Sequence, residues 1–206
     1  MIDSLHGLII AKVFASGLAI QPRILYNALM KLKDTVVLVS GASRGIGAAT
    51  AVAFAQEGAT IIINYSKDQK GAEAVLKACS AYSQQHLLQQ ADITDETQVK
   101  AMFAAIKKKY TRLDVLVNCA GIFIEGDSPT NLPVFTQIYG HNFLGAVTVT
   151  KYALSMLKQG KIINVSSING RLGQGGESEI AYSAMKAALE NYTKNLAKSL
   201  APHILV

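Results

Sequence analysis

The 206-residue sequence has few cysteines, few charges and no long hydrophobic run. It contains only Cys79 and Cys119, and no clear secretory signal precedes them. This favours a reducing, cytoplasmic setting, with both thiols as packing residues and no metal site. Charged residues make up 17% and hydrophobic residues 50% of the chain, and no low-complexity tract occurs, which excludes a largely disordered protein. At about 150 residues per domain, one folded domain is expected.

The apolar stretch at residues 8–20 is too short for a membrane-spanning helix, which needs about 20 residues. Lys12 and Gly17 interrupt it, so no membrane association is predicted. A signal peptide is disfavoured as well, because Asp3 and His6 stand where positive charge is expected. We expect residues 1–29 to form an N-terminal extension of uncertain role. An alternative start at Met30 and an amphipathic targeting helix are both open interpretations.

Positive charge exceeds negative charge, with 20 lysines and arginines against 14 acidic residues, a net charge of +6. These cations are scattered, except for a run at residues 107–109 that suits the end of a helix. No nucleic-acid-binding motif accompanies the charge, so nucleic-acid binding is not predicted.

Short β-branched runs alternate with helical patterns from residue 36 onward. The runs are apolar at successive positions, which is typical of parallel strands covered on both faces. They span residues 36–40, 60–65, 86–91, 113–118 and 161–166, with helical patterns at 48–56, 70–81, 134–157 and 181–201. Thr94 is placed to cap a further helix that carries Val99 and Ile106. This order predicts an α/β fold, a doubly wound parallel sheet of the Rossmann type.

The stretch SGASRGIG, residues 40–47, joins the first expected strand to the first expected helix. Glycines there permit a tight turn and the close approach of a diphosphate, while the helix amino terminus offers unpaired N–H groups. A plain structural turn is the alternative for such a cluster taken alone. Its place at a strand-to-helix junction favours a dinucleotide site.

Several ordered motifs over about residues 31–206 resemble the short-chain dehydrogenase/reductase family. The glycine loop is similar to the family's cofactor loop, NCAG at 118–121 to its NNAG signature, and YSAMK at 182–186 to its Tyr-x3-Lys motif. The resemblance implies that Asp92 contacts adenine and that Asn118 braces the sheet. The cofactor-binding residues that it implies are Gly41, Ser43, Arg44, Gly45, Ile46, Gly47, Asp92, Asn118, Ala120, Gly121, Tyr182 and Lys186.

Tyr182 and Lys186 share one face of the expected helix because they lie four residues apart. A free phenol has a pKa of about 10, and a neighbouring ammonium favours the phenolate. At about 4 Å and an effective dielectric constant of about 20, this attraction is about 4 kcal/mol before desolvation is counted. The pair is therefore predicted to make Tyr182 an effective proton donor.

The resemblance assigns the catalytic roles to Asn142, Ser167, Tyr182 and Lys186. Ser167 binds the substrate carbonyl, Tyr182 delivers the proton, Lys186 also holds the nicotinamide ribose, and Asn142 positions a water. Ser166 is the alternative to Ser167, which we choose because it is the second serine of the pair and Gly170 follows it. The segment from Ser167 to Tyr182 is two residues longer than expected.

The end of the second expected strand favours NADP(H) over NAD. An NAD enzyme of this architecture places an acidic residue there for the ribose 2′-hydroxyl, but NYS occupies residues 64–66 and Asp68 lies too far along. Arg44, and more weakly Ser66 or Lys67, suit a 2′-phosphate.

The run MKLKDTVVLVSGASRGIG at residues 30–47, together with NYSKD at 64–68, resembles the 3-oxoacyl-[acyl-carrier-protein] reductase branch of the family. This implies NADPH-dependent reduction of a 3-oxoacyl thioester, with acyl carrier protein as partner; another small ketone, sugar or steroid is the alternative substrate. The family's last strands and substrate lid have no counterpart before Val206, so we expect a C-terminally incomplete catalytic domain over residues 30–206. A non-catalytic nucleotide-binding or oligomerising module is therefore a further alternative, and a homodimer or homotetramer is expected at full length.

Overall fold

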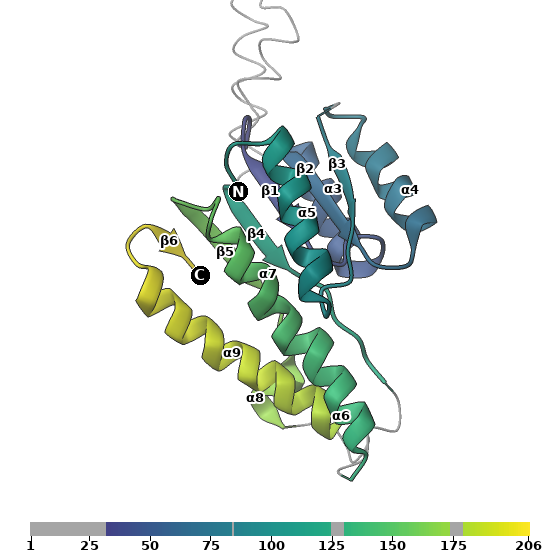
Figure 1. Ribbon diagram of the computed structural model, residues 1–206, viewed down its shortest axis with the longest axis vertical. Helices are drawn as coiled ribbons and strands as arrows, with labels where there is room; N and C mark the ends of the chain where they lie inside the picture. The colour runs from purple at the N-terminus through teal and green to yellow at the C-terminus, as the bar shows by residue number, and fades with distance from the viewer. Residues whose placement is uncertain (1–31, 84, 125–129, 174–178) are drawn as a thin grey trace, which may run out of the picture.

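The computed structural model describes residues 32–83, 85–124, 130–173 and 179–206 (Figure 1). The expected extension at residues 1–29 lies outside these ranges. Within them, parallel strands form one six-stranded sheet in the order β3-β2-β1-β4-β5-β6. The strands are β1 (Val36–Val39), β2 (Thr60–Tyr65), β3 (Leu87–Gln90), β4 (Val115–Asn118), β5 (Gly160–Asn164) and β6 (Ile204–Leu205). This order confirms the doubly wound parallel fold, with its switch point between β1 and β4.

Helices cover both faces of the sheet (Figure 1). The two helices on one face are α3 (Gly45–Gln56) and α4 (Gln69–Cys79). The other elements are α5 (Glu96–Lys109), α6 (Leu132–Tyr139), the π-helix η1 (Gly140–Leu144), α7 (Gly145–Ala153), α8 (Ile168–Leu172) and α9 (Ile180–Leu200). Of these, α5, α7 and α9 contribute to the core on the opposite face.

Alternation along the strands divides the apolar side chains between two cores. Leu38 and its register partners Ile62 and Leu116 pack with the helices α5 and α7. Val37 and Val39 point the other way, toward α3 and α4. Because both faces of the sheet are buried, each central strand is a continuous apolar run in the sequence. This pattern is why the strands could be predicted.

Two expectations about helices are wrong. Thr94 does not cap α5; the carboxylate of Asp95 accepts from the backbone N–H groups of Thr97 and Gln98, while the Thr94 hydroxyl donates to Asp92. The helix expected over residues 134–157 begins at Leu132, contains the π turn η1 and ends at Ala153. The three lysines at 107–109 do occupy the last turn of α5, where cations complement the helix dipole.

Strand β6 forms one edge of the sheet, paired in parallel with β5. Ile163 on β5 and Leu205 on β6 are 42% and 60% exposed, so the sheet is less covered here than at its centre. Across the described ranges, none of the helices is long and apolar enough to cross a membrane.

Candidate functional site

The glycine loop after β1 folds tightly against the start of α3. Gly41 has a φ of +64°, and a Cβ built there would lie 2.6 Å from the Ala120 Cα. A Cβ on Gly47 would lie 2.4 Å from the Gly41 carbonyl oxygen. Gly41 and Gly47 therefore cannot carry a side chain without displacing backbone, as the close approach of strand, loop and helix requires.

The amino terminus of α3 offers N–H groups to a ligand. Arg44 is the N-cap residue in extended conformation, its side chain caps nothing, and the first turn contains no acidic residue. Four of the other described α-helices, by contrast, have a side-chain cap, which is supplied by Asp68, Asp95, Asn131 or Ser167. An uncapped amino terminus next to a glycine turn fits the diphosphate of a dinucleotide.

Asn64, near the end of β2, supports the glycine loop. Its Oδ1 accepts from the Gly41 N–H at 3.3 Å, and its Nδ2 donates to the carbonyls of Gln89 and Ala91. The side chain is only 1% exposed. Asn64 thus ties the loop to β2 and β3.

Asp92 follows β3 and is held by its own turn. Its Oδ1 accepts from the backbone N–H and the hydroxyl of Thr94, and its Oδ2 accepts from the Ser66 hydroxyl at 3.4 Å. Burial acts to raise the pKa of Asp92, but these hydrogen bonds and the nearby His141 hold it below its ordinary value. Asp92 is therefore an ionised carboxylate whose lone pairs are largely used.

Asn118 at the end of β4 connects the sheet to two helices. Its Nδ2 donates to Thr150 Oγ1 at 3.0 Å and to Asn164 Oδ1 at 2.8 Å, and Asn164 in turn donates to Thr193. Asn118 is 3% exposed, so it lies beneath the cavity described below rather than in its wall. Asn118 therefore joins β4 to β5 and α7, and its role toward a cofactor stays a prediction.

Asn142 lies in the π turn η1 and fixes the segment that follows β4. Its Oδ1 accepts from the Ile122 N–H and its Nδ2 donates to the Ile122 carbonyl, both at 2.8 Å. A Cβ on Gly121 would lie 3.3 Å from Asn142 Oδ1 and 3.8 Å from Lys186 Nζ. The turn thus brings Asn142, Gly121 and Lys186 to one place, and π turns are common at functional sites.

Tyr182 and Lys186 occupy the first two turns of α9. Lys186 Nζ lies 5.7 Å from the centroid of the Tyr182 ring and donates to the Val165 carbonyl at 2.8 Å. Phe123 packs edge-on against the tyrosine ring, with centroids 5.3 Å apart. Burial lowers the pKa of Lys186, opposed by the nearby Cys119 thiol. The pair is held by contacts from the segments that follow β4 and β5 as well as by its own helix.

The two serines after β5 have different partners. The Ser166 hydroxyl has two acceptors within reach of its one hydrogen, the Lys186 carbonyl oxygen at 3.2 Å and Glu190 Oε1 at 3.1 Å. Ser167 is the N-cap of α8, where its Oγ accepts from the Asn169 N–H at 3.3 Å. Ser166 lines the cavity and Ser167 is not among its lining residues. Part of the longer segment before Tyr182, residues 174–178, lies outside the described residues.

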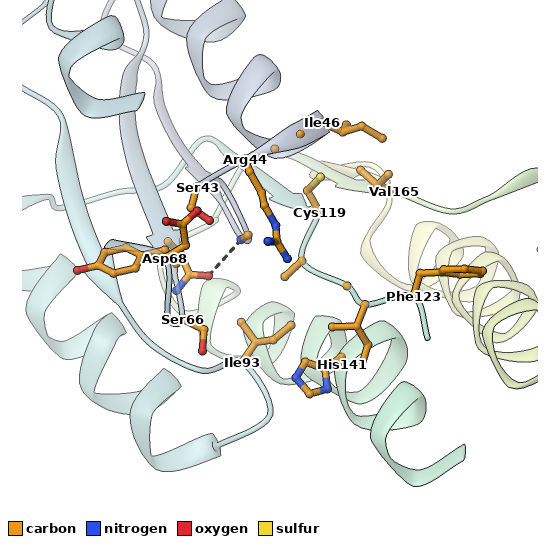
Figure 2. Close-up of a pocket in the computed structure, with 18 of the residues that line it drawn as sticks. Ser43, Arg44, Ile46, Ser66, Asp68, Ile93, Cys119, Phe123, His141 and Val165 are labelled. Atoms are coloured by element: carbon orange, nitrogen blue, oxygen red, sulfur yellow. Dashed lines mark hydrogen bonds between the residues drawn. The ribbon is translucent and has the colours of Figure 1, made fainter. Parts of the chain in front are cut away.

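One cavity of about 640 Å³ runs along the carboxyl ends of the strands (Figure 2). Figure 2 shows the Arg44 side chain extending into it from the glycine loop. The residues expected from sequence that line it are Gly41, Ser43, Arg44, Gly45, Ile46, Gly47, Asp92, Ala120, Gly121, Tyr182 and Lys186. The cavity therefore unites the diphosphate-binding loop with the tyrosine–lysine pair.

Sequence reasoning missed several lining residues. Val165 directly follows β5, and Ile93 comes three residues after the end of β3, so their positions near strand ends were a usable signal. Phe123 and His141 stand next to recognised motifs but carry no motif of their own. Asp68 lines the cavity too, although its carboxylate caps α4 by accepting from the Gly71 N–H.

Neither cysteine forms a disulfide. Cys79 is buried in the core and Cys119 is half-buried in the cavity wall, and burial raises the pKa of both thiols, that of Cys79 to about 11. Among the described residues, histidine, cysteine and acidic side chains form no cluster that could hold a metal ion.

The chain belongs to the short chain dehydrogenase family, whose model matches residues 35–206. It is therefore an oxidoreductase by family, and the family uses nicotinamide cofactors. A 3-oxoacyl-[acyl-carrier-protein] reductase of Synechocystis is 35% identical over 174 residues, which cover 82% of this chain and 70% of that protein. Hydroxynaphthalene reductase of Aspergillus fumigatus is 33% identical over 172 residues, covering 82% of this chain and 62% of the relative.

Solved structures agree with this family. A mutant of a Serratia marcescens short-chain dehydrogenase/reductase superposes with a TM-score of 0.80 at 30% identity, over 85% of this chain and 72% of the other. A short-chain dehydrogenase/reductase from Burkholderia xenovorans gives a TM-score of 0.77 at 32% identity, over 82% of this chain and 73% of the other.

Proposed function

We propose that this chain reduces a ketone to an alcohol with NADPH, and that its substrate is a 3-oxoacyl thioester carried by acyl carrier protein. The observation that carries the proposal is the single cavity lined by both the glycine loop and the Tyr182–Lys186 pair. A dinucleotide bound along the strand ends would bring its reactive half beside that pair.

In this proposal the residues of the chain orient the carbonyl and supply the proton. NADPH, when bound, supplies a hydride to the carbonyl carbon. Ser167 keeps the role of donor to the carbonyl oxygen in this proposal, although of the two serines it is Ser166 that lines the cavity. The Tyr182 hydroxyl transfers its proton to that oxygen as charge develops there. Lys186, fixed by the Val165 carbonyl, stabilises the phenolate that Tyr182 becomes and holds the nicotinamide ribose.

The preference for NADPH is supported by the charges around the β2 end of the cavity. Arg44 is exposed in the glycine loop, and Ser66 and Lys67 line the same end. The nearest carboxylates, Asp68 and Asp92, are already engaged with the backbone of their own turns. A 2′-phosphate would therefore meet a guanidinium with its fork of donors, whereas a 2′-hydroxyl would find no uncommitted carboxylate among these side chains.

The substrate is proposed from the relatives. Proteins named 3-oxoacyl-[acyl-carrier-protein] reductase from Synechocystis and Staphylococcus aureus are 35% and 36% identical to this chain. A net charge of +6 suits an acidic carrier protein. An aromatic ketone is the second candidate, because a hydroxynaphthalene reductase matches at 33% identity.

We also propose that the protein assembles as a homodimer or homotetramer through α6 and its neighbours. Leu132, Tyr139 and Leu144 are 71%, 40% and 41% exposed in this region. Light scattering of the purified chain measures the assembly, and a monomer at micromolar concentration would contradict it.

The proposed reaction is tested by following NADPH absorbance with an acetoacetyl thioester as substrate. We expect oxidation of NADPH at least about tenfold faster than oxidation of NADH at equal concentration, since a charge-assisted contact contributes about 1.5–3 kcal/mol. A naphthalenone substrate assayed in parallel tests the second candidate. NADPH binding with no turnover of either substrate would contradict the reductase proposal.

A further inference from the structure

Glu190 is a half-buried acid on α9 that the proposed reaction does not use. It lies one turn after Lys186 and is not among the residues that line the cavity. Its Oε1 lies 3.1 Å from Oγ of Ser166, which does line the cavity. A carboxylate outside the cavity lining thus contacts a hydroxyl in the cavity wall.

The single hydrogen of the Ser166 hydroxyl goes to Glu190 rather than to the Lys186 carbonyl. That carbonyl oxygen, 3.2 Å from Ser166 Oγ, lies inside α9, where the backbone N–H four residues further on is its regular partner. A hydrogen bond to a carboxylate is charge-assisted and about twice as strong as one to a neutral acceptor. The Ser166 hydroxyl is therefore committed to Glu190, which leaves the donor role in the proposed reaction to Ser167.

The peptide bond between Val165 and Ser166 links this contact to the ammonium of Lys186. The Val165 carbonyl, which accepts from Lys186 Nζ at 2.8 Å, and the Ser166 N–H belong to one planar unit. The direction of that carbonyl therefore depends on how Ser166 is held. The Val165 N–H donates to the Asn118 carbonyl at 3.0 Å, so β4 holds the other side of this residue.

The backbone of α9 is fixed at the same height by α8. A Cβ on Gly170 would lie 2.7 Å from the Lys186 carbonyl carbon and from the Ala187 nitrogen. Such close packing prevents α9 from sliding along α8, so the backbone of Lys186 has a fixed position. The direction of the Val165 carbonyl then decides where the end of the lysine side chain lies.

We propose that Glu190 is a positioning residue: by holding Ser166, it orients the Val165 carbonyl that anchors the Lys186 ammonium near Tyr182. This role rests on the proposed function, in which Lys186 stabilises the phenolate that Tyr182 becomes. Without Glu190 the ammonium is held less firmly, so Tyr182 keeps its proton to higher pH and transfers it more slowly.

The test follows the reduction of an acetoacetyl thioester by NADPH as a function of pH. In Glu190→Ala the pH at which kcat falls to half should move upward by about 0.5–1 unit, and kcat below that midpoint should fall about three- to tenfold. Glu190→Gln keeps an acceptor for the Ser166 hydroxyl, so it should return the midpoint to that of the unmodified chain and kcat to within about twofold. Glu73→Ala, at an exposed glutamate of α4 outside the cavity lining, is the matched control and should change neither quantity.

Ser166→Ala removes the other end of the contact and is measured alone and together with Glu190→Ala, so that a folding defect in one variant leaves the test in place. The double variant should shift the midpoint no further than the single variants, because all of them lack the same hydrogen bond. A midpoint that neither single variant moves upward, shifts that add in the double variant, or an equal shift in Glu190→Gln would overturn the role of Glu190 while leaving the proposed function standing. An unmodified chain that binds NADPH without reducing the thioester would instead contradict the proposed function, and the role of Glu190 with it.

Discussion

Lys186 Nζ lies 5.7 Å from the Tyr182 ring centroid and donates to the Val165 carbonyl at 2.8 Å. The second contact was not evident from the Tyr-x3-Lys spacing. It means that the ammonium is anchored to the residue that follows β5, so the helix and the sheet together set its distance from the tyrosine. Lys186 is 6% exposed, so its side chain is largely shielded from solvent.

Replacing Lys186 by Met should weaken cofactor binding and slow turnover together. A hydrogen bond to a charged group contributes about 1.5–3 kcal/mol, so the Kd for NADPH should rise about tenfold or more. Lys194→Met, at an exposed lysine on the same helix, is the control and should change neither quantity. Titration calorimetry and steady-state kinetics measure the two effects, and an unchanged Kd would contradict the ribose contact.

Two glycines of the cofactor loop should respond differently to alanine. Gly41 and Gly45 both have positive φ, +64° and +57°, which costs an alanine about 1–2 kcal/mol. Only at Gly41 would the new Cβ also meet backbone, at 2.6 Å, whereas nothing lies within 4 Å at Gly45. Gly41→Ala should therefore lose about 1–3 kcal/mol more stability in urea unfolding and abolish NADPH binding. Equal losses in the two variants would show that the contact with Ala120 is unimportant.

Arg44→Gln tests the 2′-phosphate contact. The KM for NADPH should rise about 10- to 100-fold, because a charge-assisted pair of bonds is lost, while the KM for NADH should change less than about twofold. Lys70→Gln, at an exposed lysine of α4 outside the cavity lining, is the control. A proportional rise of both KM values would assign Arg44 to the diphosphate instead.

His86 should make the stability of the fold depend on pH. Its Nδ1 accepts from the Ile61 N–H and its Nε2 donates to the Cys79 carbonyl, which requires the neutral ring. Burial lowers the pKa of His86, aided by Lys109 and opposed by the Cys79 hydrogen bond. Below about pH 6.5 the unfolded chain therefore binds more protons than the folded one, and stability falls as pH falls.

The loss should approach about 1.4 kcal/mol per pH unit within this window. Urea unfolding at a series of pH values measures it. His86→Gln should flatten the profile, whereas His203→Gln, at an exposed position, should keep it. A profile unchanged by His86→Gln would assign the pH dependence to another group.

The sheet could be predicted because its strands are buried on both faces. Ile61, Ile62 and Ile63 are all 0% exposed. A strand buried on both faces is apolar at every position, and this continuous β-branched run is visible in the sequence. Helix ends were harder: Thr94 and Asp95 are both good capping residues, and the choice depends on Thr94 being engaged by Asp92.

The site was predicted only where a motif carried it. The loop glycines, Tyr182 and Lys186 recur at recognisable spacings and do line one cavity. His141 and Gln137 also line this cavity, but they belong to no recognisable motif. The π turn at 140–144 shifts the helical period there and so decides which side chains face the cavity. The hydrogen bond from Lys186 to Val165 joins a helix to a strand and depends on tertiary packing.

The account depends most on Tyr182 as the proton donor, and single-turnover oxidation of bound NADPH by an acetoacetyl thioester tests this directly. Tyr182→Phe keeps the ring that packs against Phe123 but removes the hydroxyl, so the rate should fall by about 10²–10⁴-fold with the Kd for NADPH unchanged. Tyr82→Phe, at a tyrosine outside the cavity lining, should react at the unmodified rate. A Tyr182→Phe rate within about threefold of the unmodified chain would contradict the account.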